Sequence, residues 1–173
     1  GKNMSVIQGK RIVYLYRLLD EAKTNDATAI AFTTENSTSI SSDSDTVSTK
    51  SGSIRVPKDP ETEIKATAIF ASENDEIAKK IKAAVLNGDM LEIWEANLDD
   101  PGDDTNEGKF AATYYHGYAT SYELTSNSED HAEVALEFAI DGKGVDGYAT
   151  VSDEQQAIAD LVFKDTKKDT SGE

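Results

Sequence analysis

The stretch DHAEVALEFAI, residues 130–140, decides the fold class of this chain. Its apolar residues alternate with charged and small residues, so an extended backbone would place them on opposite faces. The pattern predicts a β-strand with one buried face and one face that is solvated or turned to an assembly partner. The apolar series is Val134, Leu136, Phe138 and Ile140, and the opposite series is Glu133, Ala135, Glu137 and Ala139.

The segments on either side extend this β pattern. Residues 110–124, FAATYYHGYATSYEL, predict a strand with an aromatic ladder on one face, and Gly117 indicates a bulge or bend within it. A turn is expected at Asn127 and Ser128. The glycines of DGKG, residues 141–144, predict a second turn before a short strand over residues 145–151. Ser152 is expected to cap a short helix over residues 153–160.

Four earlier segments also have strand character. Residues 10–19 are apolar on both alternating faces and predict a strand buried on two sides. Residues 27–34 predict a second strand, with Ile30 and Phe32 on one face, that could pair with the first as a hairpin-like unit. Further strands are expected over residues 62–71 and 90–98.

One amphipathic helix is expected over residues 73–87. Ile77, Ile81 and Ala84 recur at helical spacing, and Asn87 and Gly88 end the pattern. Ser72 is the expected N-cap, with Asp75 three positions on as a capping-box analogue. The chain is therefore predicted to be a single domain, residues 1–173, of mainly β (α+β) class, a β-sandwich or partly closed barrel with one flanking helix.

Two polar segments do not fit a core. Residues 36–57, NSTSISSDSDTVSTKSGSIRVP, are rich in serine and threonine and are expected to form a long inter-strand loop without regular structure. So long a loop in a compact domain normally has a function, so we expect it to contact another molecule. Residues 164–173 are expected to form a polar, mobile C-terminal arm.

Composition limits the classes of function. The net charge is −16, from 33 acidic and 17 basic residues, which argues against a nucleic-acid grip but also suits a surface past which DNA slides. There is no cysteine, so disulfides and thiolate metal sites are excluded. Since neither a membrane-spanning apolar run nor a secretory signal is evident, we expect a soluble, intracellular protein without membrane contact.

Candidate chemistry is sparse. His116 could act as a general base, but a histidine among tyrosines is more often a packing or interface residue. The pairs Glu92/Glu95 and Glu133/Glu137 would need a cleft and a nucleophile to form a hydrolytic site. The acidic stretch at residues 99–107 lacks the spacing of a calcium loop and fits a turn better. We therefore predict no catalytic residue, no metal and no cofactor.

The order of segments along the chain resembles the major tail tube proteins of long-tailed siphophages that infect Gram-positive bacteria. The segments that carry the resemblance are IVYLYRLLDEA (12–22), AIAFTTE (29–35), SDSDTVSTKSGSIRV (42–56), ETEIKATAIFA (61–71), YYHGYATSYELTSNSEDHAEVALEFAIDGKG (114–144) and VFKD (162–165).

The resemblance implies a non-enzymatic structural subunit of the virion tail. Such subunits stack as hexameric rings into the tube through which DNA leaves the capsid, with the long loop and terminal arms contacting the next ring. The implied partners are further copies of the chain, the tape measure protein and other tail proteins, and DNA that passes without specific binding. Departing from the family pattern, the chain is enriched in serine and threonine over residues 37–53.

This interpretation assigns roles to particular charges. An acidic row facing the lumen would repel phosphate, and Glu133 and Glu137 are the candidates. Complementary charges set register at interfaces. The candidates on the loop are Asp43, Asp45, Thr46, Lys50 and Arg55.

The main alternative is a monomeric β-sandwich that binds carbohydrate or protein through an aromatic face around Tyr114, Tyr118 and Tyr122. An enzyme that uses His116 is a third hypothesis.

Overall fold

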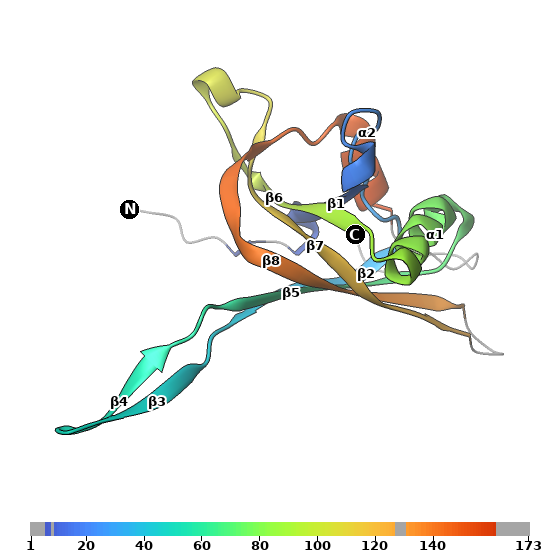
Figure 1. The fold of residues 1–173 in the computed structure, drawn as a ribbon. Coiled ribbons are helices and arrows are strands. Elements are labelled where there is room, and N and C mark those ends of the chain that lie inside the picture. Colours follow the sequence, from blue (N-terminus) through green and yellow to red (C-terminus); the bar gives the residue numbers. More distant parts are fainter. Residues whose placement is uncertain (1–5, 8, 127–130, 162–173) are drawn as a thin grey trace.

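The computed structural model describes residues 6–7, 9–126 and 131–161. A six-stranded antiparallel sheet and a separate two-stranded hairpin make up most of it, with one main helix (Figure 1). The sheet curves and does not close, so the mainly β prediction with one flanking helix is confirmed. The strands are β1 (Ile12–Leu18), β2 (Thr33–Ser41), β3 (Ser44–Thr49), β4 (Gly52–Pro57), β5 (Glu61–Ile69), β6 (Met90–Pro101), β7 (Phe110–Thr125) and β8 (Glu133–Ala149); the helices are α1 (Ser72–Asn87) and α2 (Asp153–Ala159).

The order of strands in the large sheet is β1-β6-β7-β8-β5-β2. Strands β1 and β2 are therefore its two edges, and the expected pairing of the first two strands as a hairpin is wrong. Only an isolated bridge, Tyr16 to Thr28, joins β1 to the segment that follows it.

The expected strand over residues 27–34 is also displaced. Ala29, Ile30 and Ala31 are buried, but Phe32 has φ 58°, which breaks the extended backbone, and β2 begins at Thr33. An alanine- and isoleucine-rich segment therefore fills space between elements without pairing as a strand. Burial, rather than strand formation, explains its apolar character.

Strand β1 is buried on both faces, as its pattern predicted. Tyr14 and Tyr16 face the main core under α1, where Phe138 and Ile64 are fully buried. Val13 and Leu15 face a second, smaller core that includes Val151 and is partly covered by α2. Two cores thus share one strand, which fixes the position of α2 relative to the sheet.

Helix α1 agrees with the expected range, but its N-terminal cap differs. Ser72 is the first helical residue and Asn74, not Asp75, makes the cap. The Asn74 side chain is buried; its Oδ1 accepts the Ala71 N–H at 3.0 Å and its Nδ2 donates to the Ala31 and Ile69 carbonyls at 2.8 Å each. Asn74 thereby ties the start of the helix to the end of β5.

The expected turn at residues 141–144 is wrong, because β8 runs through it. Gly142 and Gly144 have φ 72° and 78° and form an irregularity in one continuous strand of 17 residues. The pairing with β7 shifts at this point, between Tyr114 and His116, and shifts again between Ala119 and Ser121. A β-carbon on Gly117 would lie 2.1 Å from the Ala139 carbonyl oxygen, so glycine is required there.

The segment over residues 36–57 has regular structure, contrary to the loop expected there. Residues up to Ser41 extend β2 along β5, and β3 and β4 then form an antiparallel hairpin. Threonine, valine and isoleucine favour strands, and Lys50 and Ser51 form the turn. Low hydrophobicity alone therefore did not exclude a strand pair. The hairpin projects from the body in Figure 1.

The expected turn at Asn127 and Ser128 and the C-terminal arm of residues 164–173 lie outside the described residues. The short C-terminal helix is confirmed as α2, with the Ser152 side chain accepting the Gln155 N–H. Within the described residues, neither helix is long and apolar enough to cross a membrane.

Candidate assembly surfaces

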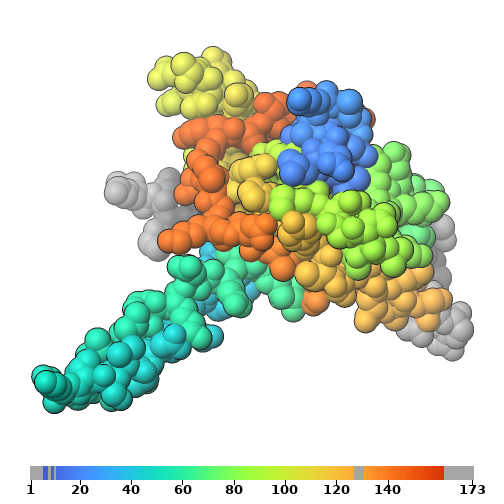
Figure 2. Space-filling model, in the orientation of Figure 1, coloured from blue at the N-terminus to red at the C-terminus, as the bar shows by residue number. Residues whose placement is uncertain are grey.

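The hairpin is the first candidate surface, because every residue of β3 and β4 is exposed. Figure 2 shows it standing clear of the body. Its base is held by the Lys58 N–H, which donates to the Asp43 carbonyl at 2.8 Å, and its tip by the Thr49 hydroxyl, which donates to the Gly52 carbonyl at 2.6 Å. The hairpin is thus a built projection rather than a collapsed loop.

The charged residues expected at this surface are spread along the hairpin. Asp45 pairs with Lys58 at 3.3 Å, where both side chains are more than half exposed. Thr46 lies opposite Arg55 across the ladder, and Lys50 lies at the turn. The structure therefore brings these residues onto one projection without joining them in one network.

Sequence reasoning missed the apolar side of the hairpin. Val47 lies directly opposite Ile54, and Val56 is opposite Asp45 on the same face. The alternation of Ile54 and Val56 after the turn is the signal that could have revealed it. We refer to Val47, Ile54 and Val56 as the apolar hairpin face.

The second candidate surface is the face of the sheet opposite the main core, here called the polar sheet face. Glu133 and Glu137 both lie on this face of β8, as expected from their alternation with buried residues. The pairing registers also place Glu35, Glu61, Glu63 and Glu123 there, with Lys65. The acids near Lys65 on this face therefore outnumber it.

Lys65 lies at the centre of this polar sheet face. Its ammonium contacts the carboxylates of Glu63 at 3.3 Å and Glu137 at 3.4 Å. Hydrogen bonds to Glu63 and Glu137 raise the pKa of Lys65, so it stays charged. Glu137 is thus partly neutralised, whereas Glu133 is exposed and forms no ion pair with another residue that the structure describes.

A buried ion pair joins β1 to β6. Arg17 Nε donates to Glu92 Oε1 at 2.9 Å, with side chains 18% and 7% exposed. The Tyr114 hydroxyl donates to Glu92 Oε2 at 2.6 Å, and the guanidinium lies 5.0 Å from the Trp94 ring centre. Burial, with Glu92 accepting the hydrogen bond, raises the pKa of Tyr114 to about 12. The two oxygens of Glu92 are thus both engaged, and Glu95 is held separately by Tyr14 and Thr38.

His116 is exposed on β7. Its Nδ1 lies 4.0 Å from Asp141 Oδ2, and its ring is 6.2 Å from that of Tyr114. Among the described residues, no group of three or more His, Cys, Asp or Glu side chains could hold a metal ion. This arrangement suits a surface residue beside a bend in β8.

The three tyrosines of the expected aromatic face are separated. Tyr114 is engaged by Glu92, Tyr118 is exposed opposite Ala139, and Tyr122 packs against the main core with Lys82 over its ring. The register shift after Ala119 turns Tyr122 to the opposite side of the sheet from Tyr118. A shared aromatic binding face therefore does not form.

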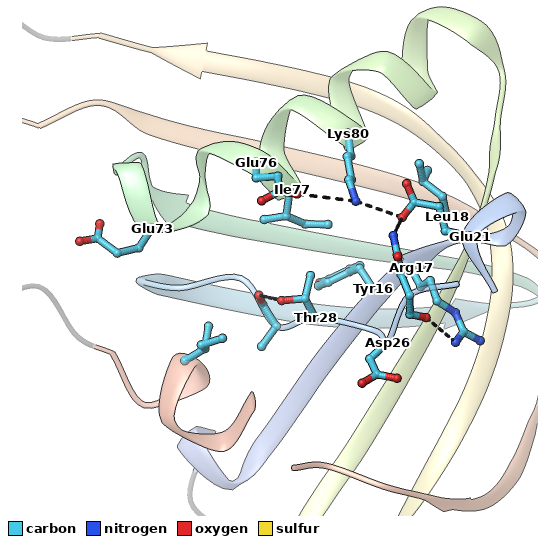
Figure 3. Close-up of a pocket in the computed structure, with 13 residues that line it drawn as sticks. Tyr16, Arg17, Leu18, Glu21, Asp26, Thr28, Glu73, Glu76, Ile77 and Lys80 are labelled. Atoms are coloured by element: carbon cyan, nitrogen blue, oxygen red, sulfur yellow. Dashed lines mark hydrogen bonds and ion pairs between the residues drawn. The ribbon is translucent and has the colours of Figure 1, made fainter. Parts of the chain in front are cut away.

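Figure 3 shows a hollow of about 340 Å³ between α1 and the segment after β1. Lys80 reaches from α1 to Glu21 at 3.0 Å, and this hydrogen bond lowers the pKa of Glu21. Arg17 Nη1 donates to the Asn25 carbonyl at 3.1 Å. The pair of Lys80 and Glu21 thus holds this segment against α1.

The family model described as "Phage tail tube protein" matches residues 6–146. A protein of Staphylococcus phage phiMR25, described as a putative tail protein, is 31% identical over 126 residues, which are 73% of this chain. The matched region spans 65% of that relative's length.

Solved structures share the fold. The SPP1 tail tube protein superposes with a TM-score of 0.69 at 17% identity, covering 97% of this chain and 96% of that chain. A subunit from the tail of an empty gene transfer agent particle, refined with C6 symmetry, gives a TM-score of 0.57 at 18% identity, covering 80% of this chain and 96% of that one.

Proposed function

Since the chain belongs to the phage tail tube protein family, we propose that it assembles into hexameric rings that stack into the channel for DNA ejection. Family membership places the protein among the structural proteins of the virion tail. The observation that carries the proposal is the match of family model and fold over nearly the whole described chain. The C6 symmetry of the gene transfer agent tail supports six subunits in each ring.

The free edges of the sheet support ring formation. Beyond its pairing with β6, strand β1 has only the isolated bridge from Tyr16 to Thr28, and β2 pairs only with β5, so each edge leaves unpaired backbone groups among the described residues. Exposed edges invite strand pairing between chains, and a closed ring uses that tendency for a defined assembly. The edges therefore serve as the contacts between neighbours in one ring.

The polar sheet face suits the lumen. Glu133 and Glu137 belong to a group of acids that outnumber the neighbouring Lys65, and a surface of this charge repels phosphate. Because Lys65 offsets part of the charge at Glu137, Glu133 is the stronger contributor of the two. DNA would pass such a wall without specific binding.

The hairpin is the stacking element between rings in this proposal. It extends from the body and offers Asp43, Asp45, Thr46, Lys50 and Arg55 to a neighbour. The tape measure protein and other tail proteins are the further partners that a tail tube subunit requires.

Electron microscopy of the purified chain tests the proposal. Negative-stain images of concentrated protein should show rings or tubes with a central channel. Because Ser41 pairs directly with Glu61, an Asn-Gly turn can replace residues 42–60 without breaking the β2–β5 ladder. This variant should remain folded and form no long tubes; persistent monomers of the parent chain, even with tail-assembly partners present, would contradict the proposal.

A further inference from the structure

The hairpin has two chemically different faces. Val47, Ile54 and Val56 lie on one side and are 44%, 53% and 43% exposed. The other side carries hydroxyl groups and one base: Ser44, Thr46, Ser48, Ser53 and Arg55. An amphipathic ladder of this kind has the pattern of a strand pair that packs on a surface.

No described residue covers the apolar hairpin face within this chain. A two-stranded hairpin alone is at best marginally stable in water, so contact of this face with a partner would add stability. A group of adjacent exposed apolar side chains also marks a site of interaction with another molecule. The charges of the hairpin and of the rest of the chain indicate which partner fits this face.

Charge identifies the partner as a second copy of the chain. Residues 42–58 hold the bases Lys50, Arg55 and Lys58 and the acids Asp43 and Asp45, a net charge of +1. The whole chain carries −16, so the rest carries −17. The hairpin is therefore complementary in charge to the body of its own kind.

One hollow on the body has a lining that complements the hairpin in charge and apolar character. It has a volume of about 660 Å³ and lies across β6, β7 and β8, and we call it the β6–β8 groove. Its lining includes the acids Glu95 and Asp146 and no lysine or arginine, whereas Arg11 lines a neighbouring hollow and Arg17 and Lys80 line the hollow of Figure 3. Its small and apolar lining residues are Ile12, Ala96, Ala111, Ala112, Gly147 and Tyr148.

The hairpin and the β6–β8 groove lie on different sides of the molecule. In Figure 1 the hairpin projects at the lower left, while the end of β8 that precedes α2 and the start of β7 lie in the upper part of the view. A contact between two different surfaces of identical chains is head-to-tail and can repeat without limit. This is the geometry that stacking requires.

We propose that the apolar hairpin face of one copy docks in the β6–β8 groove of a second copy. Ile54 and Val47 then pack against Ala111 and Tyr148. Asp45, on the same face of the hairpin, is paired with Lys58, so Lys50 at the turn is the base that steers the hairpin to Glu95 and Asp146. The inference rests on the proposed stacking function and specifies the residues that carry it. Ser48 and Ser53, which lie opposite each other on the hydroxyl face, are left to solvent.

Engineered cysteines test the contact, since the chain has none of its own. The variant Ile54→Cys/Ala111→Cys, assembled and then oxidised, should give a ladder of covalent multimers on a non-reducing gel. The matched control Ser53→Cys/Ala111→Cys moves the thiol to the other face of the same strand and should lose the ladder. Two cysteines whose Cα atoms lie more than about 7 Å apart do not form a disulfide, so a cross-link reports a direct contact between the two positions.

The outcomes separate this inference from the proposed function. If tubes form but Ile54→Cys/Ala111→Cys gives no cross-linked multimers, the docking site is wrong while stacking stands. The same follows if Ile54→Cys/Ala111→Cys and Ser53→Cys/Ala111→Cys cross-link equally. Absence of tubes from the parent chain would instead overturn the function itself. If the double variant fails to assemble, tubes grown from parent chain mixed with the Ile54→Cys and Ala111→Cys single variants should still yield cross-linked dimers, and their absence would also overturn the site.

Discussion

Two antiparallel ladders in this molecule follow the same alternating pattern but differ in what covers their apolar faces. In the β5–β8 pair, Ile64 lies opposite Phe138 and both are fully buried under α1. In the β3–β4 hairpin, Val47 lies opposite Ile54 and both are exposed. The difference shows that alternation specifies strands, whereas the cover over the apolar face belongs either to the protomer or to the assembly.

The largest loss of stability should come from the covered ladder. Phe138→Ala removes a fully buried ring that stacks on Tyr16 at 5.4 Å, and such cavities cost about 3–5 kcal/mol. Urea unfolding of the protomer, followed by Trp94 fluorescence, measures the loss. A change below about 1 kcal/mol would mean that the sheet relaxes into the cavity and is not tightly packed.

The buried ion pair should have the next largest effect. Glu92→Gln leaves the Arg17 charge without its carboxylate, and breaking a buried pair costs about 3 kcal/mol, reduced here because Arg17 keeps its bond to the Asn25 carbonyl. Glu137→Gln, which loses an exposed contact to Lys65, is the matched control and should leave the unfolding midpoint unchanged. Equal midpoints for the two variants would contradict the burial argument.

The parts of the fold that sequence could predict are those with a local signal. Helix α1 and strands β5 and β8 follow from apolar spacing, and the resemblance identified the family. The glycines of residues 141–144 mimic a turn, yet in a long curved strand the same positive φ values accommodate a bend. Whether these residues form a turn or a bend within one strand is decided by the pairing of β8 with β7, which lies earlier in the sequence.

The candidate surfaces show the same limit. Alternation placed Glu133 and Glu137 on one face, and the structure agrees in their placement, while their role at the lumen is a proposal. The apolar hairpin face was missed because Val47, Ile54 and Val56 are diluted by serine and threonine. Their common orientation depends on the register of the hairpin, which the turn at residues 50–51 sets.

Raising the pH should remove the contribution of the hydrogen-bonded Tyr114 to the free energy of unfolding, but should not affect the exposed Tyr118 in this way. The pKa of Tyr114 is about 12, against about 10 in an unfolded chain, so its contribution is complete below about pH 10 and is lost as pH rises through 12. Tyr114→Phe should cost about 1 kcal/mol at pH 7, and the gap to the parent should close between pH 10 and 12. Urea unfolding of both proteins across this range measures it. Tyr118→Phe, at an exposed position, is the control and should show no such convergence; a pH-independent gap for Tyr114→Phe would contradict the proton linkage.

The smallest effect on the protomer is expected at the apolar hairpin face, and it tests the comparison most directly. Ile54→Thr preserves a β-branched side chain and a strand position but removes apolar surface that is already 53% exposed, so the free energy of unfolding of the monomer should change by less than about 0.5 kcal/mol. Tube growth, followed by light scattering, should nevertheless slow, because the substituted residue lies in the proposed contact. Ser53→Thr, one residue away on the hydroxyl face, should alter neither quantity. If Ile54→Thr destabilised the monomer as Phe138→Ala does, the hairpin would have to be covered within its own protomer, and the distinction between the two ladders would fail.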